Sequence, residues 1–348
     1  NVCAGIANLS KSLCAAVERL AEDLYDSQCH FVYELVQNAE DAHRRTSSTT
    51  TGPPTLRLAL GGSGSGQYFV SESNEAGFTQ ADVAAICDIS ASSKARPSSG
   101  GSTIGCKGIG FKSVFTVSDQ PHVLSRGFTF SFDVAGPLGK LAYVTPTWLT
   151  PADLAALPSE VLAAHAAGRT VLYLPLKRPS LAAEIRREMD ELAEQGRATL
   201  LFLRRLERIE LAPRAGATPR TLRRIGDATL ESTVVVAVDE GDTIAEHGYQ
   251  LHRHCVGGES AIAAAELVLA FPMLAELSSE DHSSGRDVSD SPEASPPRLE
   301  PIFCSLPVRA VGFGFALNCE QFDLVANRGD LHRSSLTNRA LRDALPVA

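Results

Sequence analysis

Residues 30–45, HFVYELVQNAEDAHRR, decide how the first part of this chain folds. Apolar residues recur in this stretch at intervals of three and four, which predicts a helix that packs one side against a core. Glu34, Asn38 and Asp41 are spaced four and three apart, so their side chains project from one face of that helix. Carboxylate and amide groups beside a packed face are costly unless they bind something, although a solvated stripe gives the same pattern.

The segments around this helix predict an α+β fold. Helical spacing extends over residues 11–45, and the alternating stretches TLRLAL (55–60) and QYFVSES (67–73) predict two strands. The run GGSGSG joins these strands and opens no helix, so we interpret it as a flexible turn rather than a phosphate loop. A short helix is predicted over 79–89, with Thr79 as its N-cap.

The remaining segments predict further strands and helices of an α+β fold, followed by a partial second α/β or α+β domain. Strands are expected at 122–133, 140–145, 170–176, 230–238, 247–255, 261–271 and 302–318. Amphipathic spacing predicts further helices at 180–195 and 335–345.

Composition limits the class of protein. At 348 residues the chain is long enough for two domains, and its 44% hydrophobic and 21% charged residues are ordinary for a globular protein. The net charge of −9 argues against non-specific binding to nucleic acid or to anionic membranes, and no apolar run reaches membrane-spanning length. The scattered cysteines form no C-x-x-C pair, so we expect free thiols in a reducing intracellular compartment, cytoplasmic or nuclear.

The glycine-rich segment IGCKGIGF (104–111) is a candidate phosphate-binding loop. Its glycines precede a predicted helix near Phe111, so backbone N–H groups and the helix N-terminus would face an anion. Lys107 and Lys112 lie in or beside the loop and would add positive charge. The glycine spacing is neither that of a Rossmann fold nor that of a P-loop.

The helix stripe and the glycine-rich segment together fit a nucleotide site. The amide oxygen of Asn38 is a suitable ligand for Mg²⁺, with the phosphates of ATP supplying others. Glu34, one turn earlier, would polarise a water for attack on the terminal phosphate. The polar loop 90–103 would fold over the nucleotide as a lid.

These motifs resemble the boxes of the GHKL ATPases, which include heat-shock chaperones, gyrase B, MutL and histidine kinases. The matching stretches are ELVQNAEDA, NEAGFT, SSK and IGCKGIGFKSVF, in the family's order. The similarity extends over residues 20–210, and the motif sequences are most similar to those of the sacsin and NO VEIN group. This resemblance implies a GHKL-type two-layer sandwich over residues 1–215, with a mixed, largely antiparallel sheet and helices on one face.

The resemblance also implies roles for individual residues. Glu34 matches the catalytic base and Asn38 the Mg²⁺ ligand, whereas Asp41 closes the same helix motif with a more structural role. Thr170, in GRTVLYLPL, matches a strand threonine near the adenine. The nucleotide-binding set that the family implies is Asn38, Asp41, Asn74, Gly77, Lys94, Gly105, Lys107, Gly108, Ile109, Gly110, Phe111 and Thr170.

The adenine box departs from the chaperone pattern D-x-G-x-G. The corresponding stretch here is SESNEAGF, with no Asp and with Gly77 as the one retained glycine. Asn74 is the best substitute, since its amide oxygen can accept from an adenine amino group without a charge. The alternative is a degenerate site that no longer binds nucleotide.

The second half, residues 216–348, is similar to the middle domain of the chaperones. FDLVANRGDLHRSS resembles a segment whose arginine reaches the terminal phosphate, which makes Arg328 a second candidate catalytic residue. Alternatively, Arg328 pairs with Asp330 or Asp323 in a surface loop. The Ser/Pro/acidic tract at 277–298 is predicted to be a disordered insertion.

The sequence therefore predicts Mg²⁺-dependent ATP binding and slow hydrolysis that drive lid and domain rearrangement in a chaperone-like or scaffold protein. The expected partners are the nucleotide, protein clients or partner domains, and a second copy of the chain in a nucleotide-dependent homodimer, with neither membrane nor nucleic acid. The alternatives are a non-hydrolysing interaction module and a histidine-kinase-like phosphotransferase. A role in DNA topology or repair, as in gyrase B and MutL, is a further alternative, and the net negative charge argues against it.

Overall fold

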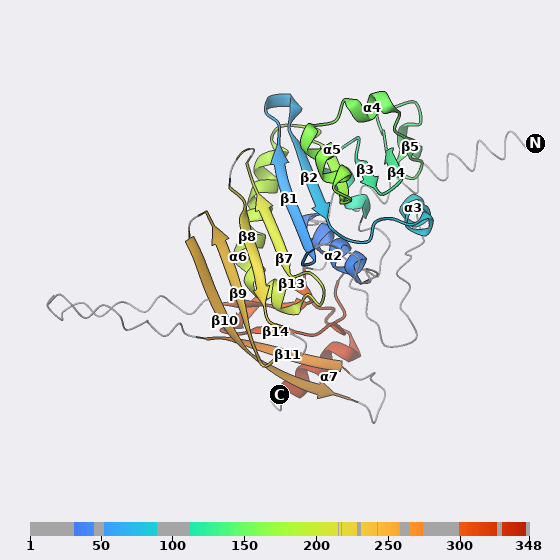
Figure 1. Cartoon of the computed structure of the whole chain (residues 1–348). Coiled ribbons are helices and arrows are strands. Elements are labelled where there is room, and N and C mark those ends of the chain that lie inside the picture. The colour runs from blue at the N-terminus through green and yellow to red at the C-terminus, as the bar shows by residue number, and fades with distance from the viewer. Residues whose placement is uncertain are drawn as a thin grey trace, which may run out of the picture. The chain divides into compact units, whose positions relative to one another are not determined.

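The chain folds as an α+β protein with a large mixed, mostly antiparallel sheet and several helices (Figure 1). The computed structural model describes residues 31–44, 52–88, 111–214, 216, 218–227, 231–241, 243–257, 265–273, 299–325 and 329–345. The predicted lid at 90–103 and the tract at 277–298 lie outside these residues. In the described part of the chain, no helix is both long and apolar enough to cross a membrane.

The chain divides into two compact units. One comprises the described residues of Asn1–Arg224 and Ala237–Ala245, and the other those of Ile225–Val236 and Glu246–Ala348. Strands β9 (Thr233–Glu240) and β10 (Thr243–Val256) contribute residues to both units.

The first unit is built on a mixed sheet with the strand order β8-β7-β1-β2-β6-β3-β4-β5. Its strands are β1 (Thr55–Gly61), β2 (Tyr68–Ser73), β3 (His122–Ser125), β4 (Phe128–Ser131), β5 (Thr147–Trp148), β6 (Thr170–Pro175), β7 (Arg208–Ala212) and β8 (Arg220–Ile225). Strands β1 and β7 are parallel, whereas the other neighbouring pairs are antiparallel. The predicted hairpin of β1 and β2 is confirmed, with the Gly/Ser run as its turn.

Helices cover both faces of this sheet, not one face as predicted. The helices are α2 (Phe31–His43), α3 (Gln80–Cys87), α4 (Pro151–Ala155), α5 (Ser159–Ala166) and α6 (Leu181–Phe202), with 3-10 helices η1 (Gly64–Gly66), η2 (Phe111–Thr116) and η3 (Gly139–Tyr143). Successive side chains of β2 point to opposite faces. The centre of the Phe69 ring lies 5.3 Å from that of Phe31 on α2, whereas Val70 packs with Val161 of α5.

Several local predictions need correction. Residues 140–145 do not form a strand, because the chain makes the 3-10 helix η3 there. The helix expected after Phe111 is the short 3-10 helix η2. Helices α4 and α5 were not predicted, although Thr150 opens α4 with a capping box. A capping box at Thr79 likewise begins α3, as expected.

The second unit packs one helix against an antiparallel-rich sheet. Its strand order is β13-β12-β14-β11-β10, with β11 (Ala265–Pro272), β12 (Glu300–Cys304), β13 (Leu306–Phe313) and β14 (Ala316–Asn318), and its helix is α7 (Leu336–Ala344). The core is apolar and consists of Ala265, Leu267, Leu269, Ile302, Leu317, Cys319, Phe322 and Leu341. The predicted C-terminal helix is therefore confirmed as α7.

Candidate functional site

A buried carboxylate fixes helix α2, which carries the Glu34, Asn38 and Asp41 stripe. Glu40 is 4% exposed, and its two oxygens accept the backbone N–H groups of three successive residues at 2.8–2.9 Å. The donors are Arg204, Arg205 and Leu206, in the link from α6 to β7. Burial raises the pKa of Glu40, and the three hydrogen bonds work against that rise. The carboxylate therefore ties the C-terminal half of α2 to this link.

Helix α6 also holds the first turn of α2. The backbone N–H of Val32 donates to the carboxylate of Glu188, whose pKa burial raises to about 7. The Tyr33 hydroxyl donates to Gln195 on the same helix at 3.2 Å. Both ends of α2 are thus attached through side chains outside the predicted stripe.

The stripe itself lies along one edge of α2. Glu34 and Asn38 are half-buried and one turn apart, and Asp41 is 9% exposed. Helix α2 packs against η2, which begins at Phe111 directly after the glycine-rich segment. The structure therefore brings this helix to the residue that ends the predicted phosphate loop. Gly105, Lys107, Gly108, Ile109 and Gly110 lie outside the described residues, as do Lys94 and Arg328.

Glu75 joins two residues that the sequence assigned to the base site from separate motifs. This carboxylate is 5% exposed. One of its oxygens accepts the Thr170 hydroxyl at 2.5 Å, and the other accepts the Gly77 N–H at 2.7 Å. The Ser125 hydroxyl lies 2.7 Å from the Thr170 hydroxyl and accepts the Phe78 N–H at 2.9 Å. Gly77 and Thr170 are thus parts of one buried network.

Gly77 is required by this geometry. Its φ of +83° is a backbone conformation that residues with a side chain rarely adopt. A Cβ atom there would also lie 2.6 Å from Cγ of Arg126. The retained glycine of the predicted box therefore positions the N–H that Glu75 accepts.

Asn74, the predicted substitute for the missing Asp of the adenine box, has both ends of its side chain hydrogen-bonded to the chain. Its amide oxygen accepts the Thr55 N–H at 2.8 Å, and its amide nitrogen donates to the Pro53 carbonyl at 2.9 Å. Both ends of the side chain therefore bind the backbone that leads into β1. The neighbouring Glu75 is the buried carboxylate of this segment, and the sequence analysis did not single it out. The signal was available: an acidic residue two positions before the retained glycine.

Helix α2 and the Glu75 network meet the same end of strand β2. His43, in the last turn of α2, has its Nε2 atom 3.1 Å from the hydroxyl of Ser73, which ends β2. Ser73 is the register partner of Thr170 across β2 and β6. Burial lowers the pKa of His43 to about 4, so this contact forms with a neutral imidazole at neutral pH.

The sequence analysis expected Lys112 to add positive charge beside the glycine-rich loop, but the structure buries this side chain. The side chain turns inward, with 8% of the residue exposed. Its ammonium donates to the backbone carbonyls of Ile86 and Tyr143.

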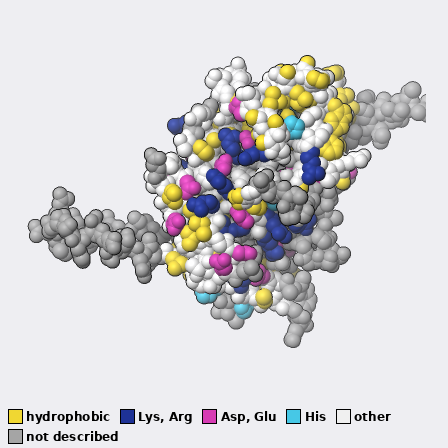
Figure 2. Space-filling model, in the orientation of Figure 1, with side chains coloured by type: hydrophobic (Ala, Val, Ile, Leu, Met, Phe, Trp, Pro, Cys, Tyr) yellow, Lys and Arg dark blue, Asp and Glu magenta, His cyan; other side chains and the backbone are white. Residues whose placement is uncertain are grey.

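On the face of the sheet that carries Val70 and packs with α5, charged side chains are paired with one another. Arg57 and Arg169 both bind Glu72, at 2.5 and 3.5 Å, and Arg208 binds Glu210 at 2.9 Å. Basic and acidic side chains are accordingly interspersed on the face shown in Figure 2. This face therefore presents no single sign of charge for a ligand.

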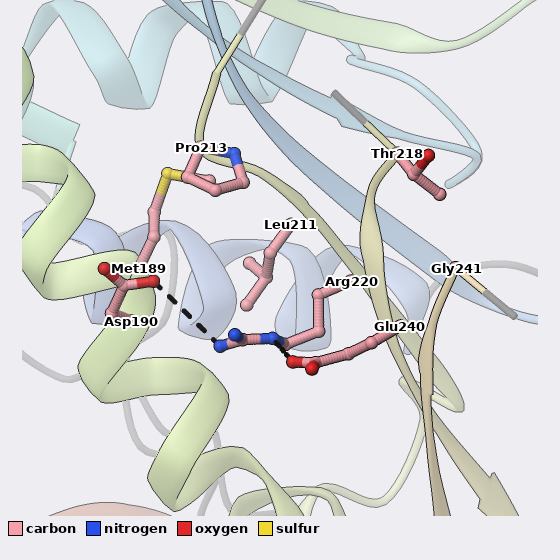
Figure 3. A pocket seen from close by; sticks show the side chains of 8 residues that line it. All are labelled: Met189, Asp190, Leu211, Pro213, Thr218, Arg220, Glu240 and Gly241. Carbon is pink, nitrogen blue, oxygen red and sulfur yellow. Dashed lines mark ion pairs between the residues drawn. The ribbon is translucent and has the colours of Figure 1, made fainter. Parts of the chain in front are cut away.

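A pocket of about 180 Å³ lies between α6 and the ends of β7, β8 and β9 (Figure 3). Arg220 points between Asp190, at 4.0 Å, and Glu240. The pocket floor is apolar, with Met189 and Leu211. None of the predicted site residues lines this pocket.

The fold and these contacts define an α+β protein whose first unit concentrates buried ionisable side chains around α2, the segment after β2, and η2. No family model matches the chain. The chain is homologous to Protein NO VEIN of Arabidopsis thaliana, with 29% identity over 340 residues. The match covers 95% of this chain and 11% of the relative, so the chain spans about a tenth of the length of the protein it matches.

Proposed function

We propose that this chain binds ATP with Mg²⁺ and hydrolyses it slowly, so that the nucleotide drives lid and domain rearrangement in a chaperone-like or scaffold protein of the sacsin and NO VEIN type. One observation carries the proposal. Glu75 binds both the Gly77 N–H and the Thr170 hydroxyl, and this network adjoins the end of β2 that α2 also reaches. Two motifs far apart in the sequence, both assigned to the adenine site by resemblance, thus supply one buried polar cluster.

The residues present suit a magnesium nucleotide. The amide oxygen of Asn38 and the carboxylate of Glu34 are hard oxygen donors on one edge of α2, and Mg²⁺ prefers such ligands. Asn38 would hold the ion, which supplies charge neutralisation to the phosphates. Glu34 would accept a proton from the attacking water. The buried anchors at Glu40 and Glu188 keep this edge in a fixed position.

Glu75, rather than Asn74, is the group that we assign to the nucleobase. A carboxylate has lone pairs beyond the two used by Gly77 and Thr170, so it can also accept an exocyclic amino group. A charged acceptor binds that amino group more strongly than an amide does. This assignment restores the charge that the adenine box lacks when Asn74 is placed there.

Calorimetric titration of the purified chain with ATP and ADP, with and without Mg²⁺, tests the proposal. We expect Glu34→Ala to keep binding and to lose hydrolysis, because Glu34 acts on water alone. Asn38→Ala should lose the part of the affinity that depends on Mg²⁺. Glu184→Ala, on the exposed side of α6, is the matched control and should change neither. ATP hydrolysis by the Glu34→Ala variant would show that Glu34 is not the catalytic base.

Glu75→Gln tests the base site separately. The amide keeps the size of the side chain and removes its charge, so ATP affinity should fall about tenfold while magnesium dependence stays. Unchanged affinity in this variant would remove Glu75 from the base site.

A non-hydrolysing interaction module is the second candidate. The observation that favours it is the engagement of both Glu75 oxygens within the chain, at 2.5 and 2.7 Å. A site whose polar groups are already satisfied gains less from a ligand. Binding without turnover, or no binding to either nucleotide, would decide for this candidate.

A further inference from the structure

We propose that Lys112 is a positioning residue for the nucleotide site, because its ammonium ties together the C-terminal ends of α3 and η3 and thereby fixes η2 beside α2. This inference rests on the proposed function. Lys112 touches no nucleotide in it and acts through the placement of Phe111 and η2.

The contacts of Lys112 join three segments of the first unit. Its Nζ atom donates to the Ile86 carbonyl, near the end of α3, at 2.5 Å. It also donates to the carbonyl of Tyr143, the last residue of η3, at 2.5 Å. The ammonium lies 5.3–5.9 Å from the centres of three aromatic rings, which belong to Phe111, Phe115 and Phe132.

These two carbonyls explain why a cation occupies a buried position. The last carbonyl groups of a helix have no partner within the helix and carry partial negative charge. A buried lysine in turn needs acceptors, and aromatic faces add favourable electrostatic contact. One ammonium from η2 therefore satisfies the ends of two other helices. An apolar side chain of similar length would fill the space and leave both carbonyls unpaired.

The tie bears on the site through Phe111. Lys112 follows Phe111 directly, and η2 packs against α2, the helix of Glu34 and Asn38. The Phe111 ring also packs with Phe115 and Phe132, at 6.5 and 5.7 Å. Loss of the tie therefore shifts η2, and Phe111 with it, relative to the edge of α2 that we assign to Mg²⁺.

The charge of Lys112 makes this tie sensitive to pH. Burial lowers its pKa to about 8, whereas Cys87 and Asp88 act to raise it. Several elements packed around Lys112 carry charged or titratable side chains. These are Asp82 and Cys87 on α3 with Asp88 at its end, Lys140 and Tyr143 on η3, Asp133 after Phe132, and Tyr33, Glu34, Glu40, Asp41 and His43 on α2. Above pH about 8 the amine loses its charge, and its bonds to the carbonyls weaken.

The test measures ATP affinity with saturating Mg²⁺ at pH 7, 8 and 9. In the wild type we expect affinity to fall about three- to tenfold over this range. Lys112→Arg keeps a charge at every pH, so its affinity should stay constant across the range. Lys112→Met should bind about tenfold more weakly at pH 7 and show no further fall. Lys140→Met, an exposed lysine on η3, should behave as the wild type.

Four outcomes would overturn the inference. Wild-type affinity that does not change with pH is one, and a Lys112→Met variant with the affinity and pH profile of the wild type is another. If Lys112→Met does not fold, the profiles of the wild type and Lys112→Arg decide, and equal slopes are the third. In each of these outcomes the proposed function stands. Absence of ATP binding by the wild type at every pH is the fourth outcome, and it overturns both.

Discussion

The two units of this protein use buried polar groups differently. In the described part of the first unit, the buried acidic, basic and histidine side chains are Glu40, Asp41, His43, Glu72, Glu75, Lys112 and His122. In the described part of the second, Glu300 is the buried charged residue, and the core around α7 is apolar. Burial of a charge is costly unless it is paired, and functional sites are where such costs are commonly met. The contrast locates the candidate chemistry in the first unit.

The buried charges of the first unit also differ among themselves. Glu40 and Lys112 form hydrogen bonds with backbone groups alone, and these bonds hold α2 and η2 in position. Glu75 instead binds a glycine N–H and a threonine hydroxyl, so one of its two partners is a side chain. A buried charge that binds backbone groups alone therefore indicates a structural role in holding an element in place. A buried charge that also binds a side chain is the better candidate for a ligand contact.

The strongest test of this contrast removes the Glu40 carboxylate. Glu40→Ala leaves three buried N–H groups without an acceptor, so we expect the free energy of unfolding of the first unit to fall by about 3–5 kcal/mol. Urea denaturation followed by the fluorescence of Trp148, the single tryptophan, reports on this unit. Glu207→Ala, an exposed neighbour of the donor segment, should change stability by less than about 0.5 kcal/mol. A small loss in Glu40→Ala would mean that the three N–H groups find other acceptors.

The second unit should respond to loss of volume instead. Leu341 of α7 is fully buried in the apolar core, so Leu341→Ala should cost about 3 kcal/mol by creating a cavity. The protection of Cys319, which is fully buried in the same core, measures this loss through its rate of reaction with a thiol reagent. Leu336→Ala, at an exposed position on the same helix, is the control. Equal rates in both variants would contradict the close packing of this core.

His43 predicts a loss of stability in acid that arises in the first unit. Its pKa in the folded chain is about 4, below the usual 6.5, so the unfolded chain binds a proton that the folded chain refuses. Stability should therefore be unaffected by His43 above pH 6.5 and should fall as the pH drops from 6.5 toward 4, by about 2–3 kcal/mol. The measurement is the difference in urea stability between the wild type and His43→Gln across that range. Parallel curves for the two proteins would contradict it.

The smallest effect separates a backbone fixing from a ligand contact. Asn74→Ala removes two hydrogen bonds to the chain around Pro53, so we expect a loss of about 1–2 kcal/mol in stability. Because Asn74 takes no part in the base site that we propose, ATP affinity should remain within about twofold of the wild type. A large drop in affinity with little loss of stability would return Asn74 to the role that the sequence suggested.

Local patterns in the sequence predicted many of the elements and left out the long-range contacts. The stretches 122–133 and 302–318, each expected as one strand, fold as two and three strands. The hairpin of β1 and β2, the cap of α3 at Thr79 and the helix α7 follow from alternation, capping chemistry and helical spacing. The helices α4 and α5 were missed because, at five and eight residues, they are too short to show a helical period. The position of α5 over β2 and β6 depends on which side of the sheet the chain crosses, and periodicity does not encode that side.

The sequence by itself determined that one edge of an early helix carries Glu34, Asn38 and Asp41, because helical spacing puts residues three and four apart on one side. It also identified Gly77 as the retained glycine of the adenine box, whereas the need for a glycine there follows from its φ of +83° in the structure. Only the tertiary structure decided that Glu75 joins Gly77 to Thr170, and that Glu40 and Lys112 bind backbone groups on distant segments. The reason is that a buried charge is satisfied by whichever polar groups the packed chain brings within about 3 Å, and those partners lie far from it in the sequence.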